Sequence, residues 1–369
     1  MSEKENITYL NADILQNFMK DVFIGLGVPK EDAEIISEVL ITSDLRGMDT
    51  HGIQRCKMYY DRINQGIYEV NTKIDIITDG PTTALWDGNN GMGHVIAHKA
   101  MKTAIEKAKK YGIGAVAVRN STHFGIAGYY SLMATKEGMI GLTTTNARPS
   151  IPPTFGVEPM LGTNPLTLGA PTDEDFPYCL DCATSIIQRG KVELYNRLNK
   201  QMPDGVVIDD KGENITEPSD ILMKMTERKA ALLPLGGAGE EMSGYKGYGY
   251  ATFVEILSAA LQNGIFLRNT LGIEEDGQKR LKVGHFFLAI NIESFIPLEN
   301  FKNTSGEIMR GLRSAKKYPN AKQIYTAGEK EHQSILKRKQ TGIPLNKSIQ
   351  EDMKIMKKEL GLDSYNFPF

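Results

Sequence analysis

The middle of the chain alternates between two spacings of its apolar residues, and this alternation constrains the fold more than any other feature. Residues 94–110 and 127–136 repeat their apolar positions every three to four residues, as amphipathic helices do. Short strand-like runs flank these helices at 74–78, 83–86, 114–118 and 140–145. Such a strand–helix–strand order predicts a sheet with helices packed on it.

The chain beyond residue 145 adds further expected elements. A long helix is predicted over 248–262, where Asn263 and Gly264 end it. Further strands are predicted at 166–168, 178–180, 206–208 and 285–290. We therefore expect an α/β layer that continues well past residue 145.

Both ends of the chain follow helical spacing instead. The clearest helical segments are 11–26, 29–45, 53–67 and 348–360. We expect residues 1–72 and 298–369 to pack together as one discontinuous helical domain. Residues 73–297 would then form a separate α/β domain.

The charges of the chain nearly cancel, and this bears on its partners. Lysine and arginine total 43, aspartate and glutamate total 45, and the formal net charge is -2. A protein that binds a phosphate backbone carries a basic excess. We therefore expect no nucleic-acid partner.

The cysteines and the apolar runs bear on the compartment. Three cysteines are too few to staple a chain of 369 residues, which is typical of a reducing compartment. The first residues lack the apolar core of a secretion signal. No run of about 18 apolar residues occurs that would span a membrane. We expect a cytoplasmic protein without membrane contact.

The densest polar cluster near the N-terminus is RGMDTHG (46–52), with Arg55 just beyond it. Histidine exchanges a proton near neutral pH, and arginine grips a carboxylate in a planar two-point contact. If a helix starts at Thr50, His51 and Arg55 share one of its faces. The alternative is an ordinary histidine at a helix start, beside surface arginines.

Two other polar segments directly follow predicted strands, where ligands bind in open α/β sheets. Residues 119–125 contain His123, and residues 146–150 contain Arg148, a candidate anchor for an anion. Each segment has a structural alternative. The first would be a capped strand–helix loop, and Arg148 would bond the carbonyl groups of its own loop.

The glycine-rich segment GYKGYG (244–249) comes ahead of the predicted long helix. The free N–H groups at a helix N-terminus favour a phosphate, and glycines let the backbone approach it closely. Lys246 adds a full positive charge. The alternative is a turn with an exposed lysine.

Motifs for common cofactors and metals are missing or incomplete. No G-x-G-x-x-G or Walker A motif occurs, so a Rossmann or P-loop fold lacks its main evidence. Cys179 and Cys182 form a solitary C-x-x-C, whereas a structural zinc site needs four ligands. Residues three apart on a strand also face opposite sides. We expect no metal; a thiol or metal protein built on these cysteines is the alternative from another functional class.

Seven segments follow one another along nearly the whole chain: SDLRGMDTHGIQR (43–55), VRNSTHFGIAGYY (118–130), TNARPSIPPTFGVEPMLGTNPLTLGAP (145–171), LDCATSIIQRGKVEL (180–194), LLPLGG (232–237), GYKGYGYATFVEIL (244–257) and VGHFFLAI (283–290). Together they resemble the malate/L-lactate dehydrogenase family, which is unrelated in fold to the Rossmann lactate and malate dehydrogenases. Its relatives include sulfolactate dehydrogenase, ureidoglycolate dehydrogenase, diketogulonate reductase and piperideine-carboxylate reductase.

The resemblance implies an architecture. It implies a sulfolactate-dehydrogenase-like, non-Rossmann α/β fold, with a mixed, largely antiparallel sheet, helices, and a helical domain from both chain ends. The α/β domain would bind cofactor and substrate. Members of the family are dimers with the site near the subunit contact, so a homodimer is expected.

The resemblance also implies a chemistry. A hydride would pass between NAD(H) or NADP(H), with NADH favoured, and a 2-oxo or 2-hydroxy acid. The two histidine motifs of the family fall on His51, the first candidate for the acid/base, and on His123, the second. Thr50 stands where the family has serine and keeps the hydroxyl group. Arg55 and Arg148 become candidate carboxylate anchors.

Two arginines suit a dicarboxylate, which favours oxaloacetate and malate as the substrate pair. The alternatives are pyruvate/lactate, sulfopyruvate, ureidoglycolate and a cyclic imino acid. The family's cofactor contacts fall on Asp181, Cys182, Ala183, Thr184, Ser185, Tyr245, Lys246, Gly328 and Glu329.

Overall fold

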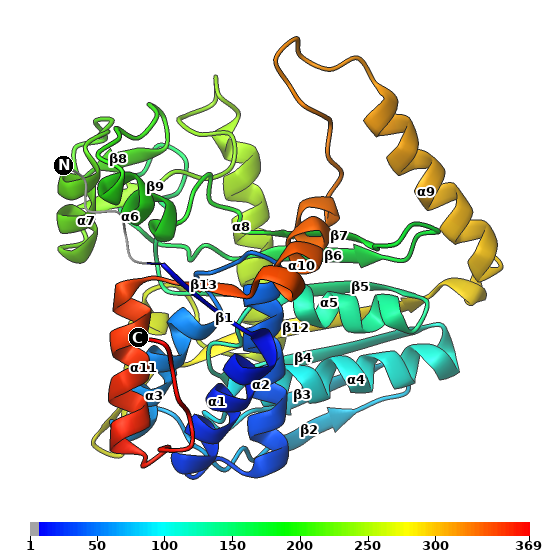
Figure 1. Ribbon diagram of the computed structural model, residues 1–369. Helices are drawn as coiled ribbons and strands as arrows, with labels where there is room; N and C mark the ends of the chain where they lie inside the picture. The colour runs from blue at the N-terminus through cyan, green and yellow to red at the C-terminus, as the bar shows by residue number, and fades with distance from the viewer. Residues whose placement is uncertain (1–6) are drawn as a thin grey trace.

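A seven-stranded sheet forms the centre of the computed structural model, which describes residues 7–369 (Figure 1). From edge to edge its strands are β2 (Asp75–Asp79), β3 (Thr83–Asp87), β4 (Ile113–Ser121), β12 (Val283–Asn291), β5 (Met139–Thr145), β6 (Leu166–Ala170) and β7 (Tyr178–Cys182). Strands β3 and β4 run parallel, and the other neighbours in this sheet run antiparallel. The predicted mixed, largely antiparallel sheet is confirmed.

Small residues in one row of the sheet let two helices lie directly on it. The row consists of Gly114, Ala289, Gly141 and Gly169, on β4, β12, β5 and β6. Helices α4 (Gly93–Tyr111) and α5 (Ala127–Lys136) cover these strands (Figure 1). A Cβ atom on Gly114 would lie 2.0 Å from the carbonyl oxygen of Ala104 in α4. A side chain in this row would therefore push the helix off the sheet.

Helix α8 (Gly244–Ser258) packs on the other face of the sheet. A Cβ atom on Gly284 of β12 would lie 1.8 Å from the Ser258 carbonyl oxygen. The sequence predicted this helix to begin near Tyr248, but it begins four residues earlier. The glycine-rich segment 244–249 therefore forms the first turn of the helix instead of preceding it.

Residues from both ends of the chain share one apolar core. The elements around it are α1 (Ala12–Gly25), α2 (Lys30–Leu45), α3 (Ile53–Asn64), β13 (Ile343–Leu345) and α11 (Lys347–Glu359). Leu40 and Tyr59 from the first end are fully buried in it, as are Ile343 and Met353 from the second. Strand β1 (Thr8–Leu10) also pairs with β13, so the two ends lie side by side (Figure 1).

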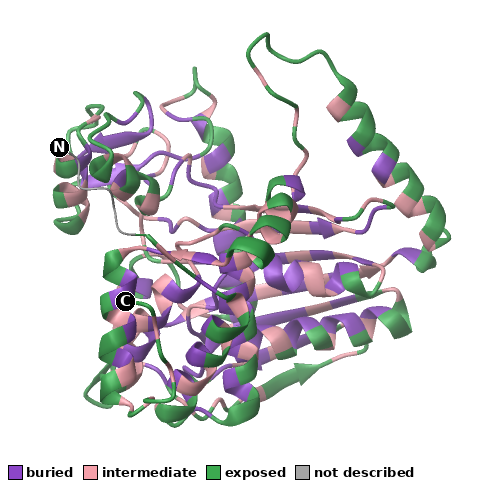
Figure 2. Cartoon of the chain, viewed as in Figure 1, coloured by how far each residue is buried: buried purple, intermediate pink, exposed green. Residues whose placement is uncertain are grey.

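One helix stands apart from this core. Helix α9 (Leu298–Ser314) projects from the body as an arm, and much of its surface is exposed (Figures 1 and 2). Arg310 of the arm forms an ion pair with Asp173 at 2.8 Å, which ties the arm to the β6–β7 connection. The chain then returns to helix α10 (Glu329–Thr341), which packs against α2.

A smaller unit with its own apolar core lies between β7 and α8. Its elements are α6 (Arg189–Arg197), β8 (Val207–Asp209), α7 (Pro218–Thr226) and β9 (Ala230–Leu232). The strand predicted at 206–208 is confirmed as β8, whereas the two short helices were not predicted. The remaining short elements are η1 (Ala260–Gln262), η2 (Leu267–Leu271), β10 (Ile273–Glu275), β11 (Gln278–Arg280) and η3 (Ile292–Ser294).

Candidate active site

A buried histidine joins the ends of two strands. His285 of β12 shares hydrogen bonds of 2.8 Å with Thr145 through Nδ1 and with Ser121 through Nε2. It is fully buried, and burial lowers its pKa to about 3, so the ring is neutral. Because Ser121 ends β4 and Thr145 ends β5, the segments that carry His123 and Arg148 start from one fixed edge.

A buried carboxyl group shapes the turn between α2 and α3. Asp44 accepts a hydrogen bond of 2.9 Å from the backbone N–H of Ile53, the first residue of α3. It lies so close to Gly52 that a Cβ atom there would be 1.9 Å from Asp44 Oδ1. Burial raises the pKa of Asp44 to about 8, so the group holds a proton at neutral pH. Gly52 is therefore required for the path of residues 46–52.

The same turn corrects one expectation from the sequence. Helix α3 begins at Ile53, so Thr50 and His51 lie in the turn before it and do not share a helix face with Arg55. The three residues still meet, because Arg55 Nε donates a 2.7 Å hydrogen bond to the Thr50 carbonyl oxygen. The turn, and not helical spacing, brings them together.

Two partly buried histidines face each other at this point. The rings of His51 and His123 stack with their centroids 5.8 Å apart and their planes 20° apart. Thr50 Oγ1 shares a hydrogen bond of 2.8 Å with His51 Nδ1, and the Tyr59 hydroxyl shares one of 2.5 Å with His123 Nδ1. Both Nδ1 atoms are thus engaged, which fixes each ring and leaves its Nε2 atom for a ligand.

Burial keeps both imidazoles neutral. It lowers the pKa of His51 to about 4, with a smaller contribution from the positive charge of Arg55. The pKa of His123 also lies well below its ordinary value because of burial, then His51 and Arg55. At neutral pH each ring can therefore accept a proton.

Arg55 and Arg62 lie near the histidine pair, and Arg148 lies near these two arginines. Burial, followed by the charges of Arg62, Arg189 and Arg55, lowers the pKa of Arg148, which retains solvent exposure. Among residues 7–369, no carboxylate lies within 4.0 Å of Arg55, Arg62 or Arg148. Like charges held this close without a counterion favour an anionic ligand.

Sequence reasoning missed two residues of this centre. Tyr59, which bonds His123, and Arg62, which donates a hydrogen bond to the Tyr68 hydroxyl, both lie on α3. They follow Arg55 by four and seven residues, so all three lie on one face of the helix. That spacing was visible in the sequence.

The first predicted cofactor segment, 181–185, lies at the end of β7. The Asp181 carboxylate accepts hydrogen bonds from the Gly128 backbone N–H at 2.9 Å and from Thr167 Oγ1 at 3.1 Å. The Thr184 hydroxyl is engaged with backbone carbonyl oxygens, and Ala183 is buried. In contrast, Ser185 Oγ is buried and has no partner among the described residues. An unpartnered hydroxyl group is suited to a ligand.

A short connection joins this segment to the second one. Ser185 pairs with Pro234, and Leu235 donates a 2.9 Å backbone hydrogen bond to Thr184. A Cβ atom on Gly247 of α8 would lie 2.3 Å from Leu235, so α8 begins directly against this connection. Tyr245 and Lys246, on the first turn of α8, are exposed beside this connection. Cys182 is the last residue of β7.

The third segment lies at the start of α10. The carbonyl oxygen of Ala327 accepts a 3.2 Å hydrogen bond from the Cys179 backbone N–H, which places Gly328 beside β7. The Glu329 carboxylate is already engaged by Gln323 at 3.0 Å and by the Thr326 backbone N–H at 3.1 Å. A ligand would therefore meet the backbone here and not the Glu329 side chain.

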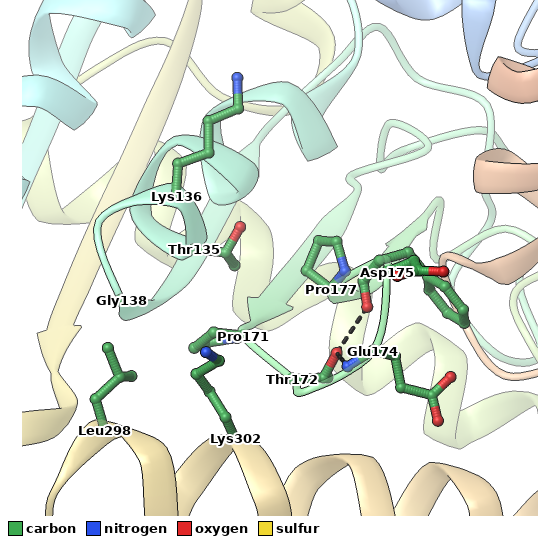
Figure 3. A pocket seen from close by; sticks show the side chains of 11 residues that line it. Thr135, Lys136, Gly138, Pro171, Thr172, Glu174, Asp175, Pro177, Leu298 and Lys302 are labelled. Carbon is green, nitrogen blue, oxygen red and sulfur yellow. Dashed lines mark hydrogen bonds between the residues drawn. The ribbon is translucent and has the colours of Figure 1, made fainter.

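No metal site accompanies this centre among the described residues, and one pocket lies apart from it. The cysteines are free thiols, and residues 7–369 contain no group of three His, Cys, Asp or Glu side chains that could hold a metal ion. A pocket of about 290 Å³ at the base of α9, lined by Thr172 and Lys302 among others, contains none of the predicted site residues (Figure 3).

Among residues 7–369, no helix is long and apolar enough to cross a bilayer.

Known proteins resemble this chain over nearly its whole length. Residues 10–354 match the protein family described as malate/L-lactate dehydrogenase. A malate dehydrogenase from Pyrococcus abyssi is 44% identical over 358 residues, which are 97% of this chain and 96% of that protein. The crystal structure of malate dehydrogenase from Entamoeba histolytica has a TM-score of 0.94 and 46% identity, over 99% of this chain and 100% of that one.

A more distant relative has the same fold. The structure of sulfolactate dehydrogenase from Methanocaldococcus jannaschii has a TM-score of 0.86 and 34% identity, covering 97% of this chain and 99% of that chain. The sulfolactate-dehydrogenase-like fold expected from the sequence is therefore confirmed. This chain belongs to the malate/L-lactate dehydrogenase family.

Proposed function

We propose that this protein interconverts oxaloacetate and malate with a nicotinamide cofactor. One observation carries the proposal: two stacked neutral histidines lie among arginines that have no carboxylate partner. A 2-hydroxy acid offers such a centre one proton to remove and at least one carboxylate to bind. The names of the relatives from Pyrococcus and Entamoeba support malate as that acid.

The histidines hold the proton. Thr50 Oγ1 can accept a hydrogen bond from a protonated Nδ1 of His51, which leaves Nε2 of His51 as the base. We therefore assign proton transfer to His51 first and keep His123, whose Nδ1 accepts the Gly125 backbone N–H, as the second candidate. The two ring centroids are only 5.8 Å apart, and His51 lowers the pKa of His123. Only one ring at a time therefore carries the positive charge. In the direction of malate oxidation, the neutral ring removes the hydroxyl proton.

The arginines orient the acid. Arg55 is held by the Thr50 carbonyl oxygen beside His51, so we assign to it the carboxylate next to the reacting carbon. Arg148, three residues beyond the end of β5 and near enough to Arg55 for the two charges to interact, would take the second carboxylate. Contacts to two carboxylates fix the reacting carbon between the histidines, whereas a monocarboxylate could bind in more than one orientation.

Two features of the segments proposed from the sequence support a dinucleotide site. Ser185, whose hydroxyl has no partner among the described residues, pairs with Pro234, and the next residue, Leu235, lies against the first turn of α8, where Lys246 is exposed. When bound there, NAD(H) or NADP(H), with NADH favoured, supplies or accepts the hydride. Asp181 and Thr184 would shape the region through their backbones, because their side chains are already engaged.

We also propose a homodimer in the cytoplasm, where the three thiols would stay reduced. The arm α9 exposes Ile308 and Leu312, with 59% and 58% of their surface open to solvent. A second copy of the chain would cover such side chains. Light scattering should give twice the mass of 40.9 kDa, and Ile308→Asp with Leu312→Asp should shift it toward the monomer. A monomeric wild-type protein would contradict the proposal.

The function is tested with a panel of 2-oxo acids and either NADH or NADPH, followed by nicotinamide absorbance. We expect the highest kcat/KM with oxaloacetate. In Arg148→Ala, loss of a charged hydrogen bond should lower kcat/KM for oxaloacetate about 10- to 100-fold. The value for pyruvate should change by less than about threefold, because pyruvate has no second carboxylate.

Arg189→Ala is the matched control for this experiment. Arg189 lies near enough to lower the pKa of Arg148, but Arg189 itself forms an ion pair with Glu193 at 3.0 Å. Arg189→Ala should therefore lower kcat/KM for oxaloacetate less than Arg148→Ala does. Equal losses for oxaloacetate and pyruvate in Arg148→Ala would contradict the dicarboxylate assignment.

The pH dependence follows from the lowered histidine pKa values. The pKa of His51 lies at about 4, so the basic form of the ring persists well into the acidic range. We expect kcat/KM for malate oxidation to show no histidine protonation step between about pH 8 and about pH 5.5. A histidine with an ordinary pKa of about 6.5 would lose roughly nine-tenths of its basic form over that range.

The reverse reaction requires the protonated ring, so kcat/KM for oxaloacetate reduction should rise as the pH falls. His51→Ala should abolish turnover and leave NADH binding almost unchanged, as measured by fluorescence titration. A titration step near pH 6.5 in malate oxidation, or full activity of His51→Ala, would contradict the assignment.

A further inference from the structure

Tyr59 of α3 has a buried hydroxyl group with one acceptor in reach. The residue is fully buried, and its ring lies among those of Tyr68, His94 and His123. The hydroxyl shares a hydrogen bond of 2.5 Å with Nδ1 of His123. Among residues 7–369 its other hydrogen-bond partner is the backbone N–H of Gly125, which is itself a donor.

These contacts determine where the proton of the Tyr59 hydroxyl points. A hydroxyl group has one proton to donate, and an N–H group cannot receive it. The proton of Tyr59 therefore points to Nδ1 of His123. The Gly125 N–H also donates to this nitrogen, at 3.4 Å. If Nδ1 carried a proton instead, the hydroxyl proton would be buried without an acceptor, which is rare in native proteins.

His123 is therefore held in one tautomer. Its ring is neutral, because burial keeps its pKa well below the ordinary value. In a neutral imidazole a bare Nδ1 means that Nε2 carries the proton. The one lone pair of the ring that could take up a proton is thus occupied by Tyr59 and Gly125. Nε2 of His123 can donate a hydrogen bond to a ligand, but it cannot act as a base.

His51 has the opposite arrangement. Its Nδ1 lies 2.8 Å from Thr50 Oγ1, and Thr50 is only partly buried. The Thr50 hydroxyl can accept a hydrogen bond from Nδ1 and turn its own proton toward solvent, which leaves a free lone pair on Nε2 of His51. The ring centroids of His51 and His123 are 5.8 Å apart, about twice a hydrogen-bond length of about 2.9 Å. One substrate oxygen therefore has room to contact both rings.

We propose that Tyr59 is a positioning residue that keeps the proton of His123 on Nε2, so that His123 donates a hydrogen bond to the substrate oxygen that His51 deprotonates. The inference rests on the proposed function and deepens it, because it gives the two histidines different roles. In malate oxidation the hydroxyl proton passes to Nε2 of His51 and the O–H electron pair forms the C=O bond, while the carbon gives its hydride to the bound nicotinamide. The N–H of His123 stabilises the negative charge that develops on the oxygen.

Substitutions of His123 test its role as a donor. The side-chain amide of glutamine donates a hydrogen bond but takes up no proton, and leucine does neither. We expect His123→Gln to keep at least about a tenth of the wild-type kcat for malate oxidation, whereas His123→Leu should lose about 100- to 1000-fold. His51→Gln is the matched control and should be as inactive as His51→Ala. Equal losses in His123→Gln and His123→Leu would overturn the inference.

Tyr59→Phe tests the positioning role, since it removes the hydroxyl and keeps the ring. Nitrogen NMR of protein with labelled histidine reads the tautomer, and the chain has only six histidines. His123, identified by the signals lost in His123→Gln, should show a bare Nδ1 in wild type and a mixture of tautomers in Tyr59→Phe. We expect kcat to fall about tenfold, with KM changed less than about threefold, because the hydrogen bond to the oxygen strengthens in the transition state.

Tyr60→Phe is the control on the same helix. It removes a hydroxyl that bonds Glu359, and it should leave kcat and the His123 tautomer unchanged. A purely structural role of Tyr59 would lower the Tm of Tyr59→Phe without moving the His123 tautomer, and that result would overturn the inference. A wild-type His123 with its proton on Nδ1 would also overturn it. Both results leave the proposed function intact, whereas a wild-type protein that reduces no 2-oxo acid would overturn both.

Discussion

The hydrogen bonds of His285 determine where the site can form. This buried ring of β12 ties Ser121 at the end of β4 to Thr145 at the end of β5, both at 2.8 Å. Leaving either buried hydroxyl without its partner would cost about 1–3 kcal/mol, so the two strand ends keep one relative position. His123 and Arg148 extend from those ends. Without the link, a histidine of the site and a carboxylate anchor would depend on two separate loops.

Burial determines the protonation states of the titratable groups around the site. Burial keeps His51 and His123 neutral, with their pKa values lowered, and keeps the Asp44 carboxyl protonated, with its pKa raised to about 8. The fixed positive charges on Arg55 and Arg148 therefore meet no local negative charge within ion-pairing distance in the described chain. An acid substrate would be bound by these charges, and its proton would pass to a ring that is ready to accept it.

Local patterns in the sequence predicted the strands and helices between residues 74 and 145, because their spacing depends only on neighbouring residues. They could not predict that β12 lies between β4 and β5, since the partners of His285 are 140 and 164 residues away. The family resemblance identified both His51 and His123 as candidates for the acid/base. It did not identify Tyr59, whose spacing on α3 was visible but whose hydrogen-bond partner, His123, lies 64 residues away in the chain.

The unit around α6 and α7 was missed for a different reason. Each helix has only nine residues and α6 is mostly polar, so both depend on packing their apolar side chains around β8 and β9. Local spacing is weak in such segments, and tertiary packing decides the outcome. The start of α8 was also misplaced, because glycines in a first helical turn are indistinguishable from a preceding loop by spacing alone.

The most direct test of the account is a crystal structure with hydroxymalonate, a dicarboxylate that carries the hydroxyl group of a 2-hydroxy acid. The account predicts one carboxylate on Arg55, the other on Arg148, and the hydroxyl oxygen about 3 Å from Nε2 of His51 or His123. A complex in which the carboxylates lie away from both arginines, or the hydroxyl points away from both histidines, would contradict it.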